Sequence, residues 1–294
     1  MSAAKRTKKS AIGPLGDLAA WALGRGRPLA AGLLVIAAFF AAWWWVWQRV
    51  GPRVTSAERY LVELDDLHLT PQPEWIHTDV RAEVYQWLRL GGPMNLLDDD
   101  LNPRIAEAFV RHPWIERVDR VAKLPAGGVQ VDLEYRRPVC VVRIGDRLLP
   151  VDRSSVLLPA GGFSRVELER YPQLVGVDAS GFEIEGEPWG SVGVAGGAAI
   201  AAVLSEVWET WHLARIMPFP VVAPDGREQL HYNLFTSGGT RIAWGLPPGI
   251  ESPAEPTAGE KLARLRAYRT RHGTFDGPAG PLDLDVRTLP DPGF

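Results

Sequence analysis

The sequence predicts an α+β protein carried on a single transmembrane helix. Three observations support this fold class. Residues 29–47 contain no charged side chain, residues 67–144 change from helical to alternating apolar spacing, and short apolar runs alternate with Pro and Gly turns over most of the chain beyond residue 145. The first pattern is typical of a membrane span, and the other two are typical of compact modules that combine helices with sheets.

The uncharged segment is long enough to cross a bilayer. At about 1.5 Å per helical residue it covers about 28 Å, close to the hydrocarbon thickness of about 30 Å. We expect its large side chains to contact lipid, with the indoles at the headgroup layer: Leu29, Leu33, Phe39, Phe40, Trp43, Trp44, Trp45 and Trp47. The sequence therefore predicts a retained helix over residues 28–48. A cleaved signal peptide, the alternative, has a shorter apolar core and small residues at its cleavage site.

The flanking charges predict the orientation of this helix. Six basic side chains and one acidic side chain precede it, whereas the rest of the chain carries 26 basic and 34 acidic residues. Positive charge favours the cytoplasmic side. Residues 1–27 are therefore predicted to be a basic cytoplasmic tail of a plasma (inner) membrane protein, with the C-terminal domains in the periplasm or outside the cell. We expect membrane lipid as a partner, and no nucleic acid, because the external part is acidic.

A β-α-α-β-β module is predicted over residues 67–144, after a juxtamembrane connector at 49–66. Its first strand covers residues 67–69, and a hairpin covers 115–121 and 129–135, where apolar and polar residues alternate. Apolar residues at helical spacing predict two helices: Val80, Val84, Trp87 and Leu88 mark the first, and Leu101, Ile105, Ala108 and Phe109 mark the second. Asp99 or Asp100 is expected to cap the second helix.

A β-rich domain with two helices is predicted over residues 145–288, followed by a tail at 289–294. Strands are expected at 139–144, 148–151, 156–158, 174–177, 229–235, 240–244 and 282–287. The first helix has an apolar stripe from Ile200 to Trp211, with the glycines between Gly193 and Gly197 at its start, and Thr257 with Glu260 forms a capping box for the second. Basic residues of the second helix predict either a solvated face or a site for anionic lipid or an acidic partner: Lys261, Arg264, Arg266, Arg269 and Arg271.

The sequence lacks the motifs of common enzyme classes. It contains no Walker A loop, no His-Glu-x-x-His zinc motif and no Gly-x-Ser-x-Gly nucleophile motif. The acidic run at residues 98–100 is expected to cap a helix rather than bind a cation, and Cys140 is expected to be a buried apolar residue. We therefore predict a protein without enzymatic activity, cofactor or metal site.

A series of short motifs occurs in a fixed order along residues 67–288. They are Leu96-Leu97-Asp98-Asp99-Asp100-Leu101, His112-Pro113-Trp114-Ile115, Arg136-Arg137-Pro138-Val139, Tyr171-Pro172-Gln173-Leu174, Gly239-Thr240-Arg241-Ile242 and Leu284-Asp285-Val286-Arg287. Their order after one N-terminal anchor resembles the bacterial cell-division protein family FtsQ/DivIB. The resemblance implies that the first module is a POTRA domain and the second the family's β domain. The chain departs from the family at its end, where Pro290 and Pro292 disfavour a further strand.

The resemblance implies a function in division and septation. It indicates a non-enzymatic, bitopic membrane scaffold whose partners are other single-pass proteins of the divisome. Such a scaffold can bind a partner strand at an open sheet edge. We expect the edge at residues 282–287, with Asp283, Asp285 and Arg287 on one face and Leu282, Leu284 and Val286 on the other. The alternative is a membrane-tethered cell-envelope enzyme or ligand sensor that uses the β-rich domain.

If this edge binds a partner, a Val286→Pro variant should lose partner binding while the first module stays folded, because proline removes a main-chain donor. Affinity purification of the tagged parent and variant chains measures this. Equal recovery of partner from both chains contradicts the edge prediction.

Overall fold

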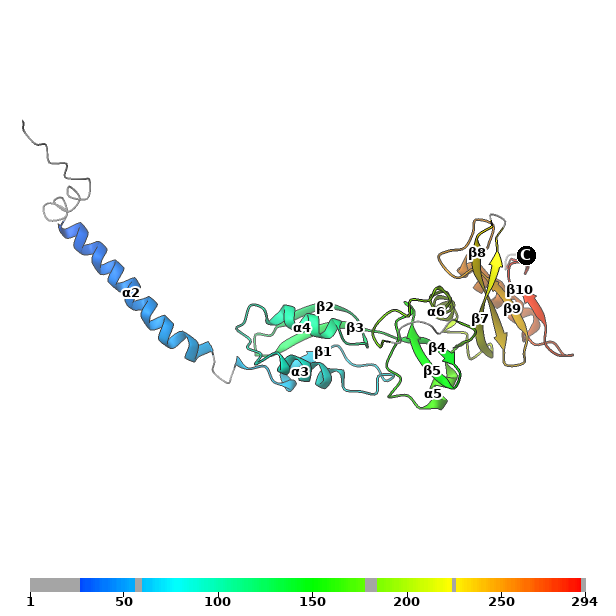
Figure 1. The fold of residues 1–294 in the computed structure, drawn as a ribbon, viewed down its shortest axis with the longest axis horizontal. Coiled ribbons are helices and arrows are strands. Elements are labelled where there is room, and N and C mark those ends of the chain that lie inside the picture. Colours follow the sequence, from blue (N-terminus) through cyan, green and yellow to red (C-terminus); the bar gives the residue numbers. More distant parts are fainter. Residues whose placement is uncertain (1–26, 56–59, 178–183, 224–225, 292–294) are drawn as a thin grey trace, which may run out of the picture. The chain divides into compact units, whose positions relative to one another are not determined.

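The computed structural model describes residues 27–55, 60–177, 184–223 and 226–291 of the 294-residue chain. The predicted cytoplasmic tail, apart from Arg27, lies outside the described residues. The fold is α+β, as predicted, with one long apolar helix near the N-terminus and two sheets further along the chain (Figure 1). The chain forms two compact units, residues 1–61 and residues 62–294.

The first unit contains helix α2 (Arg27–Thr55), of which the segment Ala31–Arg49 is long and apolar enough to cross a membrane. All side chains of residues 31–49 are exposed, including those of seven of the eight predicted anchor residues, whereas the side chain of Leu29 lies outside the described residues. Exposed apolar side chains on an isolated helix are suited to contact with lipid. The helix continues to Thr55, so part of the predicted connector is helical, although it contains Gly51 and Pro52, which disfavour a helix interior.

The first sheet and its two helices follow the predicted order. The elements are β1 (Leu67–Leu69), α3 (Val80–Leu90), α4 (Leu101–Val110), β2 (Ile115–Lys123) and β3 (Val129–Tyr135). The strand order is β1-β3-β2, with β1 parallel and β2 antiparallel to β3. Val84, Ile105 and Phe109 are fully buried in its core. The core therefore forms where the apolar helix faces meet the alternating strands.

The two helix starts differ in their capping. The carboxylate of Asp79 accepts a hydrogen bond from the amide of Ala82 at 3.0 Å and caps α3. Asp100 occupies the corresponding position of α4, but its side chain makes no capping bond. The predicted position is therefore confirmed and the predicted side-chain cap is wrong, because the backbone of Asp100 is already helical and not extended as in capping geometry.

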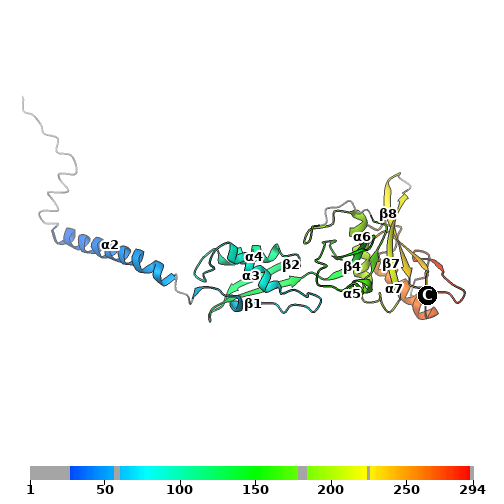
Figure 2. The same ribbon diagram turned by 60° about the horizontal axis from the view of Figure 1, so that its bottom comes forward.

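The second sheet has seven strands in the order β10-β9-β8-β7-β6-β4-β5. The strands are β4 (Pro138–Ile144), β5 (Arg147–Asp152), β6 (Gln173–Leu174), β7 (Leu213–Val222), β8 (Glu228–Thr236), β9 (Arg241–Gly245) and β10 (Asp283–Asp285). Because β4 belongs to this sheet, the chain passes from one sheet to the other at residues 136–137 and not at residue 144. Figure 2 shows the helices and strands of this part from a second side.

Three helices accompany the second sheet, one more than predicted: α5 (Arg165–Arg170), α6 (Val192–Leu204) and α7 (Ala258–His272). A capping box of Ser164 and Glu167 starts α5, and the predicted box of Thr257 and Glu260 starts α7. The start and end predicted for α6 are wrong, because its glycines lie inside the helix. A Cβ atom on Gly197 would lie 2.5 Å from Leu174 Cδ1, so glycine permits α6 to approach the sheet closely.

Two strand predictions also require correction. The sequence pattern does not predict β7, because Pro218 and Pro220 interrupt an otherwise apolar run and proline is unusual inside a sheet. Conversely, a regular strand is not formed at residues 156–158, where Val156 makes an isolated bridge with Pro188 and Leu157 makes one with Val151.

The two sheets are joined by a two-residue link with several contacts. The amide of Arg136 donates to the carbonyl of Trp114 at 2.8 Å, and its carbonyl accepts from Trp75 Nε1 at 3.1 Å. Its guanidinium donates to the buried carboxylate of Asp152 at 2.7 Å. Leu158, which follows β5, is fully buried in the core of the first sheet. These contacts explain why residues 62–294 form one unit.

A buried histidine connects the helices of the first module to β2. His112 Nδ1 lies 3.3 Å from the Trp114 amide, which donates to it, and Nε2 lies 3.0 Å from Glu83 Oε2. Both ring nitrogens therefore have partners when the imidazole is neutral and carries its proton on Nε2. Burial lowers the pKa of His112 from its ordinary value, although the contact with Glu83 acts in the opposite direction.

This environment predicts a pH-dependent stability. Because the folded pKa is below the unfolded one, the contribution of neutral His112 is present above pH of about 6.5 and decreases as the pH falls. Urea unfolding of residues 62–294 should therefore show a stability advantage of the parent over His112→Gln that shrinks between pH 7.5 and pH 5.5. An advantage that grows on acidification would instead show that the ion pair with Glu83 dominates.

Candidate partner-binding edge

The predicted binding residues lie at one edge of the seven-stranded sheet. Strand β10 is parallel to β9, with Asp283 opposite Arg241. The amide of Arg241 donates to the carbonyl of Leu282 at 2.9 Å, and the amide of Val286 donates to the carbonyl of Ala243 at 3.1 Å. Main-chain groups alternate sides along a strand. The main-chain groups of Asp283 and Asp285 therefore face away from β9, on the open side of the sheet.

The side chains of this strand divide largely as predicted. Val286 is fully buried and Leu284 packs against the core, whereas Leu282 is 37% exposed because it lies at the beginning of the strand. Asp283 accepts two hydrogen bonds from Arg241, at 2.9 and 2.7 Å. Asp285 accepts from Arg287 Nε at 2.9 Å, and this pairing lowers the pKa of the Asp285 carboxyl. The apolar side chains of this strand therefore face the core, and its paired charged side chains lie on the opposite face of the sheet.

The strand is shorter than predicted because the chain turns away after Asp285. The carbonyl of Asp285 accepts hydrogen bonds from the amide and the hydroxyl of Thr288, at 3.1 and 3.0 Å. Arg264 of α7 then donates to the carboxylate of Asp291 at 2.7 Å and to the carbonyl of Arg287 at 2.8 Å. Within the described residues, the C-terminal segment therefore leaves the sheet and packs on α7 without forming a strand beyond Leu289.

A buried ion pair supports the neighbouring strand β9. Lys261 is fully buried, and its Nζ donates to Glu255 Oε1 at 2.6 Å and to the carbonyl of Leu246 at 2.9 Å. The same Glu255 oxygen accepts from the Leu246 amide at 2.8 Å. Nζ also lies 5.3 Å from the centre of the Trp244 ring. Burial lowers the pKa of Lys261, and the bond to Glu255 opposes this effect. The pair holds the loop after β9 against α7.

This burial corrects the continuous basic face considered for α7. Lys261 is inside the protein, and Arg264 is bound to the C-terminal segment. Arg269 donates to the carbonyl of Thr210 at 3.1 Å. Arg266 and Arg271 remain exposed. The burial of Lys261 has a signal in the sequence, because Lys261 precedes the apolar Leu265 by four residues and so lies on the same helix face.

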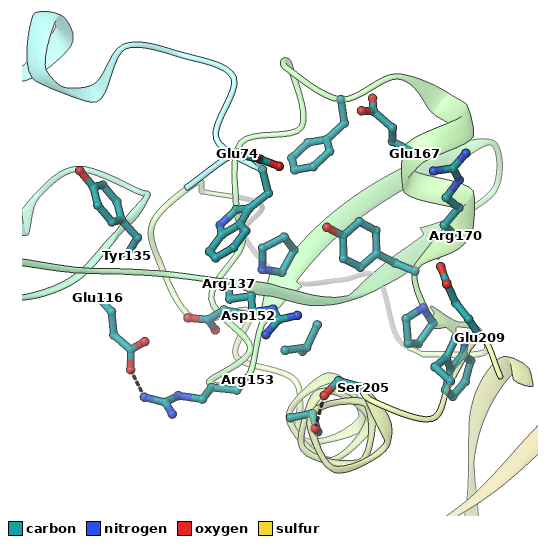
Figure 3. A pocket seen from close by; sticks show the side chains of 18 of the residues that line it. Glu74, Glu116, Tyr135, Arg137, Asp152, Arg153, Glu167, Arg170, Ser205 and Glu209 are labelled. Carbon is teal, nitrogen blue, oxygen red and sulfur yellow. Dashed lines mark hydrogen bonds and ion pairs between the residues drawn. The ribbon is translucent and has the colours of Figure 1, made fainter. Parts of the chain in front are cut away.

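A groove of about 920 Å³ lies beside the link between the two sheets (Figure 3). Its aromatic lining residues are Trp75, Tyr135, Phe163, Tyr171 and Trp208. Arg153 crosses one side and donates to Glu116 at 2.6 Å, while Arg137 lies 5.7 Å from the Trp75 ring. The volume is within the range of small-molecule sites.

Two polar side chains of the groove, Ser205 and His77, have the following partners among the described residues. The hydroxyl of Ser205, which lies at its α6 side, donates to the carbonyl of Ala202 at 3.0 Å and is not paired with a base. His77 Nε2 lies 4.0 Å from Glu167 Oε1. Among the described residues, no group of three or more His, Cys, Asp or Glu side chains could hold a metal ion.

Comparison with known proteins adds no assignment. No family model matches the chain, and no curated protein matches it significantly. The resemblance to FtsQ/DivIB therefore depends on the ordered motifs of the sequence.

The Lys261–Glu255 pair generates a stability prediction. Lys261→Met leaves the buried Glu255 carboxylate without its cation and should destabilise residues 62–294 by about 3–5 kcal/mol. The double variant Lys261→Met/Glu255→Leu should recover much of this loss, because it removes both buried charges. Urea unfolding measures the three proteins. A single variant as stable as the parent would show that the pair does not hold the loop.

Proposed function

We propose that this protein is a bitopic membrane scaffold that binds other envelope proteins through the edge of its C-terminal sheet. The observation that carries the proposal is the open side of β10. The amide and carbonyl of Asp283 and the amide of Asp285 face outward and have no hydrogen-bond partner among the described residues. A partner segment can pair with these groups and continue the sheet. The bidentate Asp283–Arg241 pair beside them supplies charges that select a partner.

The opposite end of the same sheet is less available. Beyond β5, the carbonyl of Val156 accepts from the Asp152 amide at 3.1 Å, and the Leu158 amide donates to the carbonyl of Pro150 at 2.9 Å. Residues 156–158 thus cover the C-terminal half of that edge, from Pro150 to Asp152. Strand addition at this sheet is therefore favoured at β10, although its length restricts the new ladder to two or three main-chain bonds.

The process we propose is bacterial cell division. Its support is the order of motifs that resembles FtsQ/DivIB, together with the β-α-α-β-β order of the first module, which fits a POTRA domain, and the apolar helix α2. The basic N-terminal segment favours a cytoplasmic N-terminus, which puts residues 62–294 outside the plasma membrane, in the periplasm of a bacterium with two membranes. The partners are then other single-pass proteins of the divisome.

The groove beside residues 136–137 favours a second candidate function, a membrane-tethered ligand sensor. Its volume and its aromatic lining residues make the groove a better site for a small-molecule ligand than the edge of a β-strand is. Addition of cell-wall fragments to the purified protein should then raise its melting temperature, because ligand binding to the native state stabilises it. An unchanged melting temperature favours the scaffold.

The scaffold proposal predicts a specific effect of Asp283→Pro. Proline removes the outward-facing amide and keeps the β9-facing bonds of Leu282 and Val286, so the sheet should survive while partner recovery falls about tenfold or more. Val286→Pro, the variant suggested by the sequence, is less informative, because the Val286 amide belongs to the ladder with β9. The measurement is quantitative mass spectrometry of proteins that co-purify with the N-terminally tagged chain from gently solubilised membranes.

Asp283→Ala is the matched control for this experiment. It removes the carboxylate that pairs with Arg241 but leaves the amide in place, so it separates main-chain pairing from side-chain recognition. Recovery that is unchanged by Asp283→Pro contradicts binding at this edge. Recovery lost equally in both variants assigns the interaction to the side chain and not to strand addition.

A further inference from the structure

The seven-stranded sheet has another open edge, along the outer half of β7. Strand β7 pairs with β8 over its whole length, from Leu213 to Val222. On its other side β6 covers only Arg215 and Ile216. Beyond Ile216 no described residue pairs with this side. Figures 1 and 2 show the outer ends of β7 and β8 extending away from the other strands.

Two hydrogen bonds define which main-chain groups face this open side. The carbonyl of Ile216 accepts from the Val175 amide at 3.0 Å and so faces β6. The amide of Ala223 donates to the carbonyl of Arg227 at 2.8 Å and so faces the β8 side. Because the groups alternate along a strand, those of Pro218, Pro220 and Val222 face the open edge.

The nitrogens of the two prolines therefore do not belong to the β7–β8 ladder, and the ladder stays intact. Met217, Phe219 and Val221 provide the bonds to β8, opposite Asn233, His231 and Gln229. Proline has no amide hydrogen, so Pro218 and Pro220 remove two successive donors from the open side. An incoming strand would find carbonyl acceptors there but only one donor, at Val222, which is 72% exposed.

We infer that Pro218 and Pro220 are specificity-determining residues that prevent strand addition at β7. Without them this edge would be long, apolar and open, which is the arrangement that pairs with a second copy of the same chain. Two β7 strands can pair antiparallel about a twofold axis, because each supplies the same surface. The inference does not depend on the function proposed for β10, since it concerns the association of this chain with itself.

The test restores both donors with the variant Pro218→Thr/Pro220→Thr, in which threonine also favours the strand. The full chain is purified in detergent with micelles in excess, and a label is attached at an introduced Glu228→Cys. Cys140 is fully buried and does not compete for the label. Donor-labelled and acceptor-labelled copies are then mixed. Energy transfer should rise with concentration in the double variant, above the level of the parent.

Pro253→Thr is the matched control, because Pro253 is an exposed proline in the loop after β9 and outside the sheet. It should show the same energy transfer as the parent. If the double variant does not fold, Pro220→Thr alone, at an exposed position, tests the inference by the same comparison with the parent. A folded variant with restored donors and with energy transfer equal to the parent overturns the inference.

Discussion

The constraint on which the rest of residues 62–294 depends is the short link between β3 and β4. Only Arg136 and Arg137 separate the last strand of the first sheet from the first strand of the second. Such a link leaves little freedom between the sheets, and Arg136 uses its amide, its carbonyl and its guanidinium to fix both sides. Because Asp152 is buried, loss of Arg136 would leave a carboxylate without its cation inside the protein.

The second sheet has three features that affect whether another strand can pair with its edges. Residues 156–158 cover the C-terminal half of β5, prolines remove donors from the outer half of β7, and β10 keeps a short open side. Each of these three features determines whether the main-chain donors and acceptors at an edge of the sheet are free to pair. Free donors and acceptors at an edge can bind any other extended chain. A protein that binds through sheet edges needs this selectivity, because an unprotected edge also binds copies of itself.

The sequence predicted the elements whose residues obey one clear periodicity. The helix faces around Val84 and Ile105, the hairpin of β2 and β3, and the capping box at Thr257 all have local signals, and the structure contains them. The errors occur where tertiary contacts override local preference. Glycine occupies position 197 of α6 because Leu174 leaves no room for a side chain there. Strand β7 accommodates Pro218 because the proline nitrogen faces an open edge and not β8.

The candidate site was predictable to a similar degree. The alternation of Leu284, Asp285 and Val286 identifies the strand and its two faces. The burial of Lys261 has a sequence signal in its spacing from Leu265, but charge suggested a surface position. The turn of the chain after Asp285 depends on a local hydrogen bond from Thr288 and on contacts with Arg264, which belongs to a different element, α7. The extent of the open edge therefore required the structure.

Site-specific photo-crosslinking in native membranes tests the central claim most directly. A photoreactive residue is placed at position 283 on β10 or at position 222 on β7, and crosslinked proteins are identified by mass spectrometry. The account predicts that position 283 captures small single-pass division proteins and that position 222 does not. Capture of those proteins at position 222 alone, or of no membrane protein at position 283, would contradict it.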